Sequence, residues 1–527
     1  MSMLLSILAV LSTFALLLPV AATATDLTPA QERGRQIYVT GKSPAGRPIT
    51  AYFGKDLLEV PGESATCLSC HGYDGLGRAE SGVIPSNITW RHLMKSFGHV
   101  HPTGVVHPAF TEESLMSYMR DGAFPGGRQG DPSMPVYDIA DDDLRDLLAY
   151  NRLLGSLVDP GITATEIRIG MVQPRPAGGS AMHDVASATI AAYFAEANAR
   201  GGVYGRQLKL ELLPVDPAGM NEAVLRQLLA TSDCFALIQQ QVPGLERQLA
   251  AAAEELQLPV VASFPPLSSG LRDFGRFRFQ LLAGLAEQVQ VLARQAAGRP
   301  LAAERVAILF PQRDGMAEVA ELTQRQLRGA GAVQLLMVGY SPGAFDAGQM
   351  LQRLRQERSS MIFFLGEERE GEALLQAAAI LDPLPHFYLP AAALGRGLYQ
   401  LDPRFRDHLW LAFAMLPSDR KSWGLREFEE MVNNQRLAVS QPTAQLQAYA
   451  AARLLVEGLR RTGRDLSRER YVETMERIFE FDTGVTPLLS FGKNRRIGAL
   501  GAHIVTVDPA RSGAGEPIVP VRWLDVQ

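Results

Sequence analysis

The chain has 527 residues, of which 46% are hydrophobic and 20% are charged, and its formal net charge is −5 at pH 7. This balance is typical of globular domains and excludes a disordered chain, and the length provides for about three units of ordinary size. A weakly negative chain without a basic face gives no sign of a nucleic-acid partner.

Residues 1–24 have the pattern of a secretory signal peptide. An apolar run extends over residues 4–18, and Ala22-Thr23-Ala24 follows as a small-x-small cleavage site. Because neither Lys nor Arg precedes the apolar run, a retained N-terminal anchor is the alternative. Later apolar runs in the sequence are too short to cross a membrane. From the signal pattern we expect export to the periplasm.

The segment 26–156 predicts a small all-α domain. Residues 28–31 form a capping-box pattern with Pro29 at the first helical position, which predicts a helix through 34–38. Further helices are expected at 112–121 and 141–154, the second with acidic residues in its first turn and a helical leucine stripe. The Gly- and Pro-rich remainder is expected to be loop.

The motif Cys67-Leu68-Ser69-Cys70-His71 predicts covalent attachment of one c-type haem. Each thiol can add to one vinyl group of the haem, and His71 is then the proximal iron ligand. A zinc site would need a second pair of ligands at matching spacing, and the remaining cysteine is Cys234, which we expect to be a buried structural thiol.

The best candidate for the sixth iron ligand is Met134, in Ser133-Met134-Pro135-Val136-Tyr137. A thioether on a loop stiffened by proline can reach the haem face opposite His71, and it favours reduced iron. The alternative is that one histidine of a nearby cluster binds the iron instead; the cluster consists of His92, His99, His101 and His107.

This region resembles a class I cytochrome c of the kind that serves periplasmic dehydrogenases. The resemblance rests on four motifs: Gly34-x-x-x-Tyr38, Gly72-Tyr73-Asp74-Gly75 after the haem motif, Ile84-Pro85-Ser86-Asn87-Ile88-Thr89, and Met134-Pro135-x-Tyr137. It implies one low-spin haem with His71 and Met134 as axial ligands, with Pro85 on the proximal side near His71. It also implies one-electron transfer with a periplasmic dehydrogenase or another redox partner.

After a linker at 157–164, strand-like and helix-like segments alternate, which indicates parallel sheets covered by helices on both faces. Two such blocks predict two doubly wound lobes in 165–527, with crossovers near 280 and 410. The expected strands and helices of the first block begin with 166–172, 182–199, 208–214, 221–231, 234–239, 244–256 and 259–263. A late helix at 445–462 is expected to belong to the return across the hinge.

This second region resembles the type I periplasmic solute-binding proteins, specifically the branched-chain amino-acid receptors of ABC importers. The matching motifs are Ile167-Arg168-Ile169-Gly170, Gly201-Gly202-Val203-Tyr204-Gly205-Arg206, Phe277-Arg278, Gln447-Ala448-Tyr449-Ala450-Ala451 and Thr483-Gly484-x-x-Pro487-Leu488-x-x-Phe491. The resemblance implies a two-lobed α/β fold that binds a small ligand with the loops after its strands, and an ABC permease as a partner.

Carried over to this sequence, the implied ligand-binding residues are Ser180, Gln241, Ser263, Phe264 and Glu367. Two loops depart from the amino-acid receptors. Gln239 to Pro243 replaces a small Gly/Ser loop, and Phe264-Pro265-Pro266 replaces a Thr-rich turn.

We therefore expect a periplasmic electron carrier whose second region binds a small ligand or docks a redox partner. The alternative is the substrate-binding component of an ABC importer for amino acids or related molecules, with an accessory haem. The sequence contains no Ser/His/Asp grouping and no P-loop, so an enzyme is not expected.

Overall fold

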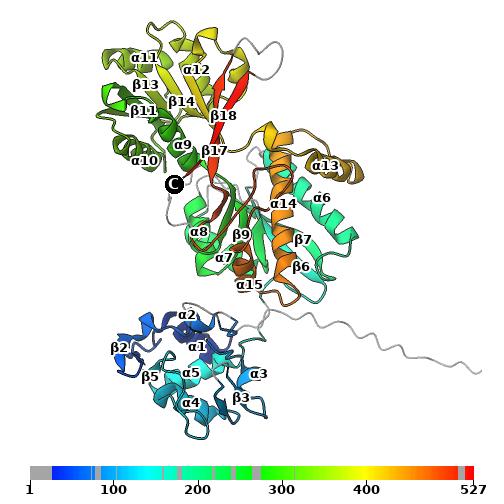
Figure 1. Cartoon of the computed structure of the whole chain (residues 1–527). Helices are drawn as coiled ribbons and strands as arrows, with labels where there is room; N and C mark the ends of the chain where they lie inside the picture. The colour runs from blue at the N-terminus through cyan, green and yellow to red at the C-terminus, as the bar shows by residue number, and fades with distance from the viewer. Residues whose placement is uncertain are drawn as a thin grey trace, which may run out of the picture. The chain divides into compact units, whose positions relative to one another are not determined.

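The computed structural model describes residues 27–72, 74–77, 83, 85–101, 104–156, 159–174, 181–216, 220–238, 245–263, 275–313, 315–508 and 517–526. The predicted signal peptide lies outside these residues. The chain divides into two compact units, Met1–Leu157 and Val158–Gln527 (Figure 1). In the described ranges, every helix is either too short or too polar to cross a membrane.

The first unit combines helices with short strands, so the expectation of an all-α domain is wrong. Its helices are α1 (Pro29–Thr40), α2 (Cys67–His71), α3 (Trp90–Leu93), α4 (Glu112–Asp121) and α5 (Asp141–Asn151). Strands β1 (Thr50–Phe53), β2 (Leu58–Pro61) and β5 (Val136–Asp138) form an antiparallel sheet in the order β2-β1-β5, and β3 (His99–Val100) pairs with β4 (Val106–His107). These strands are too short for an alternating pattern to be read, and β1 pairs with β5 far along the chain.

Helices α1 and α5 cross in close contact at Gly34. The predicted capping box begins α1, where the Gln31 amide donates to Thr28 Oγ1 at 3.3 Å and the Thr28 amide donates to Gln31 Oε1 at 2.8 Å. A Cβ atom on Gly34 would lie 1.9 Å from the carbonyl oxygen of Asp146, so only glycine allows this approach. The helices bury the aromatic rings of Tyr38 and Tyr150 between them.

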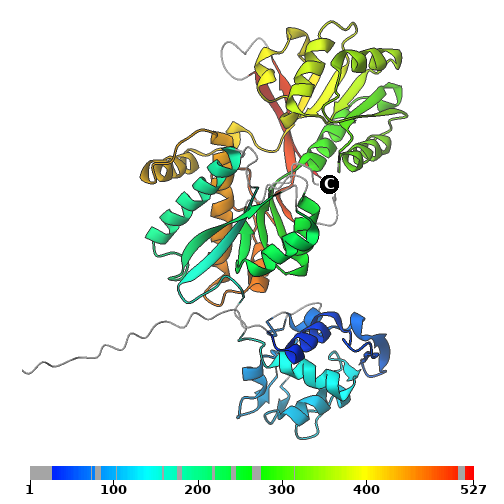
Figure 2. The ribbon, with the colours of Figure 1, turned by 180° about the vertical axis from the view of Figure 1, so that it is seen from behind.

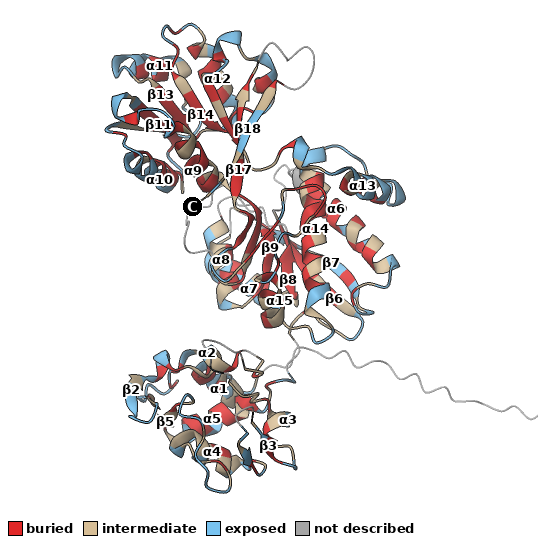
Figure 3. Ribbon diagram, viewed as in Figure 1, coloured by how far each residue is buried: buried red, intermediate tan, exposed pale blue. Residues whose placement is uncertain are grey.

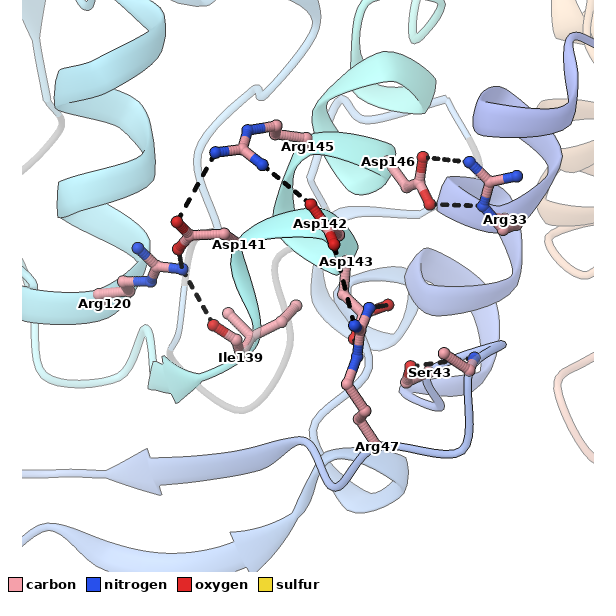
Figure 4. Close-up of polar contacts among 11 residues, drawn as sticks. Arg33, Ser43, Arg47, Arg120, Ile139, Asp141, Asp142, Asp143, Arg145 and Asp146 are labelled. Atoms are coloured by element: carbon pink, nitrogen blue, oxygen red, sulfur yellow. Dashed lines mark hydrogen bonds and ion pairs between the residues drawn. The ribbon is translucent and has the colours of Figure 1, made fainter.

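Arginines from three other segments pair with aspartates of α5 (Figure 4). Arg33 of α1 donates two hydrogen bonds to Asp146, at 2.6 and 2.9 Å. Arg47 donates to the buried carboxylate of Asp143 at 3.0 Å and lowers the pKa of that group. Arg120 of α4 pairs with the first aspartate of the helix. The aspartates of the first two turns of α5 therefore join this helix to α1, α4 and the segment before β1.

The first lobe of the second unit is built on a parallel six-stranded sheet, as the alternating pattern predicts. The strand order is β16-β10-β9-β8-β6-β7. Its strands are β6 (Glu166–Pro174), β7 (Gln207–Val215), β8 (Ala236–Ile238), β9 (Val260–Ser263), β10 (Arg278–Leu282) and β16 (Ile497–Ala499). Its helices are α6 (Ala181–Ala199), α7 (Glu222–Thr231), α8 (Glu246–Glu255), α13 (Ser422–Asn434), α14 (Pro442–Thr462) and α15 (Arg468–Met475). Helices α6 and α14 lie side by side on this sheet (Figures 1 and 2).

The second lobe contains a seven-stranded sheet in the order β12-β11-β13-β14-β15-β17-β18, of which the last two strands are antiparallel. Its strands are β11 (Arg305–Pro311), β12 (Gln334–Tyr340), β13 (Met361–Phe364), β14 (His386–Pro390), β15 (Leu409–Phe413), β17 (Gly501–Val507) and β18 (Ile518–Asp525). Its helices are α9 (Leu285–Ala296), α10 (Met316–Gly329), α11 (Ala347–Gln356) and α12 (Glu368–Ala378). One buried core lies on each face of the sheet (Figure 3).

The chain passes between the two sheets of this unit at three places. It leaves the first sheet between β10 and α9, returns between β15 and α13, and crosses again between β16 and β17. The third crossing, at Leu500, comes in addition to those expected near 280 and 410. In open α/β sheets, ligands bind at the carboxyl ends of the parallel strands.

Candidate functional site

The haem motif forms the short helix α2, which puts both cysteines and the histidine on one turn and a half of backbone. Thr66 caps the helix, since its Oγ1 accepts a hydrogen bond from the Ser69 amide at 3.2 Å. Cys67 and Cys70 form no disulfide and are partly exposed as residues, whereas the side chain of His71 is buried. The Cys67 sulfur itself is buried, and this burial raises the pKa of its thiol to about 12.

The two ring nitrogens of His71 have different environments. Nδ1 lies 2.9 Å from the carbonyl oxygen of Ser86, and because a carbonyl only accepts, Nδ1 carries the proton and donates. Nε2 is buried and has no hydrogen-bond partner among the described residues. Burial lowers the pKa of the ring, so the imidazole is neutral with a free lone pair on Nε2. An orphaned, unprotonated nitrogen of this kind suits a metal ligand oriented by a backbone carbonyl.

The carbonyl that orients His71 belongs to Ser86, one residue after Pro85, which the cytochrome resemblance places on the proximal side. Pro85 itself is adjacent in the chain, and its carbonyl packs against Gly77, where a Cβ atom would lie 2.2 Å from the Pro85 oxygen. Gly77 in turn donates its amide to the carbonyl of His71 at 3.0 Å. The segment after the haem motif therefore folds back onto His71 through backbone contacts.

Two tyrosines from distant elements hold the ends of α2. The Tyr38 hydroxyl of α1 donates to the carbonyl of Gly72 at 2.5 Å, and the Tyr137 hydroxyl of β5 donates to the carbonyl of Ala65 at 2.8 Å. Burial raises the pKa of Tyr137 well above its ordinary value, which keeps this donor protonated. The glycine–tyrosine and methionine–proline motifs of the sequence thus meet at the haem motif.

Met134 lies in the turn that leads into β5, where its amide donates to the carbonyl of Asp131 at 3.0 Å. Its partly buried side chain packs against the core cluster that Cys67 and Leu68 also contact. The fold therefore brings Met134 and the haem motif to one hydrophobic cluster.

The four histidines of the alternative assignment form a group of rings in contact around the β3–β4 hairpin, in which His99 and His107 are stacked and His92 meets His99 edge to face. The ring centroids of His99 and His107 are 4.8 Å apart, and those of His92 and His99 are 5.0 Å apart. His101 lies 3.3 Å from Ser86 Oγ, on the residue whose carbonyl holds Nδ1 of His71. The group is thus connected to the segment on the Nδ1 side of His71.

Most of the candidate ligand-binding residues of the second unit lie outside the described residues. This applies to Ser180, Gln241 and Phe264, and only the backbone of Ser263, the last residue of β9, is described. Glu367 is described and stands directly before α12, as its N-cap.

Glu367 belongs to a polar group at the carboxyl ends of β11, β12 and β13. Arg313 donates to the carboxylate of Glu367 at 2.6 Å, and both side chains are substantially exposed. The Tyr340 hydroxyl and the Glu367 amide both donate to Glu370 Oε2, at 2.6 and 2.9 Å. A Cβ atom on Gly366 would lie 2.3 Å from the Tyr340 oxygen, so glycine leaves room for this group.

Sequence reasoning missed Arg313, Tyr340 and Glu370. The first two follow or end a parallel strand, so the rule that ligands gather at carboxyl strand ends could have indicated them. Burial and the hydrogen bond to Glu370 raise the pKa of Tyr340, which is therefore a permanent donor.

A family model described as periplasmic binding protein matches residues 166–513. The chain belongs to the periplasmic binding protein family. This family consists of binding proteins rather than enzymes, which confirms the expectation that the chain is not an enzyme, and its name implies a periplasmic location. Comparison with curated proteins gave no match.

Solved structures of other bacterial binding proteins share the fold. A possible leucine/isoleucine/valine-binding protein from Rhodopirellula baltica has a TM-score of 0.55 at 16% identity, covering 68% of this periplasmic binding protein and 97% of that chain. A fatty acid ABC transporter substrate-binding protein from Thermomonospora curvata has a TM-score of 0.54 at 14% identity, with coverage of 70% and 95%. A branched-chain amino acid ABC transporter protein from Thermus thermophilus, with bound valine, has a TM-score of 0.53 at 17% identity, with coverage of 69% and 97%.

Proposed function

We propose that this periplasmic binding protein binds a small molecule in its second unit and carries one covalent haem c in its first. The family match over residues 166–513 carries the ligand-binding part of the proposal. The orphaned Nε2 of His71 on a helix with two free cysteines carries the haem part.

The ligand that we propose is an amino acid or a related small molecule with charged groups, delivered to an ABC permease. Proteins with similar folds differ in their ligands, since the one from Thermus thermophilus has bound valine and the one from Thermomonospora curvata is a fatty acid ABC transporter substrate-binding protein. In this chain, the carboxyl strand ends of the second lobe offer a guanidinium at Arg313 and a carboxylate at Glu367. These groups match the carboxylate and the ammonium of an amino acid.

Thermal unfolding of the full chain with a panel of amino acids, carboxylates and fatty acids tests this part. A ligand at 100 times its Kd raises the free energy of unfolding by about 2.7 kcal/mol, which gives a clear upward shift of one transition. Arg313→Gln should raise the ligand concentration needed for the same shift at least tenfold. Arg325→Gln, which changes an exposed residue of α10, should leave that concentration unchanged. Equal affinity of both variants and the parent would contradict a ligand role for Arg313.

The haem part rests on the residues that surround α2. Cys67 and Cys70 would hold the haem covalently, His71 Nε2 would bind the iron, and Met134 would be the sixth ligand. When bound, a haem with these ligands supplies one-electron transfer at a raised potential. The chain's own contribution is to orient His71 through the Ser86 carbonyl and to hold α2 between two tyrosines. A periplasmic dehydrogenase is the redox partner that we propose.

Periplasmic expression followed by denaturing electrophoresis and haem staining tests the attachment. Cys67→Ser and Cys70→Ser should each weaken the stain strongly, and the double variant should lose it, whereas Cys234→Ser should retain it. Met134→Ala should retain the stain but lose the weak red band that reports sulfur ligation of ferric haem. A parent protein without covalent haem would refute this part of the proposal.

A further inference from the structure

A chain of hydrogen bonds leads from His71 to the histidine group of the β3–β4 hairpin. His71 Nδ1 is 2.9 Å from the Ser86 carbonyl oxygen, and Ser86 Oγ is 3.3 Å from His101 Nδ1. His101 Nε2 is 3.0 Å from His107 Nε2, and His107 Nδ1 is 2.6 Å from the Pro108 carbonyl oxygen. Three imidazoles and one serine thus form one continuous polar path.

When His101 and His107 are neutral, the Pro108 carbonyl leaves only one possible tautomer for each ring. The Pro108 carbonyl only accepts, so His107 carries its proton on Nδ1 and its Nε2 is an acceptor. His101 must then donate from Nε2, which leaves its Nδ1 as an acceptor for the Ser86 hydroxyl. Every donor therefore faces an acceptor when both rings are neutral.

An additional proton fits on only one of the two accepting nitrogens, His107 Nε2 and His101 Nδ1. A proton on His107 Nε2 would place two N–H groups against each other across 3.0 Å. A proton on His101 Nδ1 requires only that the Ser86 hydroxyl rotate and accept, and the bond from His101 to His107 is retained. The geometry therefore makes His101 Nδ1 the proton-accepting atom of the group.

The groups around His101 and His107 disfavour a positive charge on either ring, so the two rings stay neutral until the positive charge of the nearby haem site decreases. The charged or titratable groups that face it are Lys95, His92 and His99, together with the Tyr118 hydroxyl, whose ring stacks on Phe124 beside His107. Residues 89–111 contain neither Asp nor Glu to hold a histidinium. Burial accordingly lowers the pKa of both His101 and His107.

We propose that Ser86 and His101 are positioning residues that make the potential of the haem depend on pH. The inference rests on the haem part of the proposed function. With the haem bound, one electron from a small-molecule reductant would lower the charge at the site by one, and at a pH between the two pKa values of His101 its Nδ1 would take one proton from solvent. The proton is released to water again when the electron is removed.

The direction of the effect follows from charge. A positive charge on His101 is repelled less by the reduced site than by the oxidised one, so its proton affinity is higher in the reduced protein. Protonated His101 also polarises Ser86, whose carbonyl accepts from His71 Nδ1. The potential is therefore highest below both pKa values of His101 and falls as the pH rises between them. Each tenfold difference in proton affinity between the two oxidation states corresponds to about 59 mV of total fall.

The test is a potentiometric titration of the full-length haem protein, monitored by its visible spectrum, from about pH 5 to about pH 8. The parent should show a potential that falls with pH, and His101→Gln and Ser86→Ala should each remove most of this fall while the axial-ligand spectrum stays the same. His92→Gln is the matched control, because the His92 ring contacts His99 edge to face in the same group but lies outside the hydrogen-bond path. It should keep the fall.

An equal pH dependence in the parent, His101→Gln and Ser86→Ala, with haem attached in all three, would overturn the inference and leave the proposed function standing. A parent without covalent haem would overturn both. A second measurement needs no variant: nitrogen NMR of histidine-labelled reduced protein, at a pH above both pKa values of His101, should show His101 protonated on Nε2 and bare on Nδ1, and Nδ1 should take up the proton as the pH is lowered. The opposite tautomer would refute the path.

Discussion

Replacement of Gly34 by alanine is a sharp test of the helix crossing on which the first unit is built. The added Cβ would lie 1.9 Å from the Asp146 carbonyl oxygen, 2.6 Å from its carbonyl carbon and 2.9 Å from Tyr150 Cβ. Two of these three atoms are helix backbone of α5 and cannot rotate away. The helices must therefore separate by at least about 1 Å, the difference between 1.9 Å and the 3.0 Å below which such contacts are essentially never found.

The size of the effect follows from two opposing terms. Alanine is favoured over glycine inside a helix by up to about 1 kcal/mol. Overpacking of a rigid contact costs about 1 to 3 kcal/mol, and here the upper end applies because backbone meets backbone. We expect a net loss of about 2 kcal/mol in the free energy of unfolding. For a unit of this size that corresponds to a fall of about 8 °C in Tm.

Differential scanning calorimetry of the full chain can follow this change, because the two compact units should give separate transitions. Gly34→Ala should move only the transition of the first unit. The control is Gly329→Ala near the end of α10, where nothing lies within 4 Å of the added carbon, and this variant should be neutral or slightly more stable. A first-unit transition that stays within about 1 °C of the parent would refute the close crossing.

Three further predictions concern single contacts. Arg47→Gln should lower the stability of the first unit at pH 7, and this loss should shrink as the pH falls in acid-titrated unfolding, because Asp143 has a lowered pKa in the folded state and its contribution is lost as the pH falls through that value. Glu469→Gln removes a buried carboxylate that pairs with Arg276, and urea unfolding should show a loss of about 2 to 4 kcal/mol in the free energy of unfolding. This is less than for a fully buried pair, because 31% of the arginine side chain is exposed. Tyr137→Phe should cost about 1 to 3 kcal/mol by the same measurement, since it leaves the buried end of α2 without a donor.

Local signals predicted the regular elements well. The helix expected at 112–121 is found as α4 with the same bounds, and the capping box of α1 is present. The strands of the second unit follow their apolar runs because a parallel sheet covered by helices needs apolar residues on both faces. The small sheet of the first unit was missed, since the pairing of Thr50 with Asp138 depends on a contact across most of the unit.

The haem motif could be recognised from spacing alone, but the atoms that orient it could not. Cys67, Cys70 and His71 are close in sequence, and the haem attachment that we propose requires this spacing. The proximal acceptor depends on how the segment after the motif folds back, and the structure provides the carbonyl of Ser86 instead of a contact from Pro85. The link to His101 is a tertiary contact between two loops, for which no local pattern exists.

The polar group at the carboxyl strand ends of the second lobe also bears on the charge of the ligand. Arg313 and Glu367 already neutralise each other, and their side chains are 40% and 62% exposed, so water screens the pair and its separation costs little. A zwitterion can insert between them and pair its carboxylate with the guanidinium and its ammonium with the carboxylate. An anion would satisfy Arg313 but leave Glu367 facing a like charge, and a fatty acid would do the same. At this proposed ligand site we therefore expect zwitterionic ligands to bind more tightly than anionic ones of equal size.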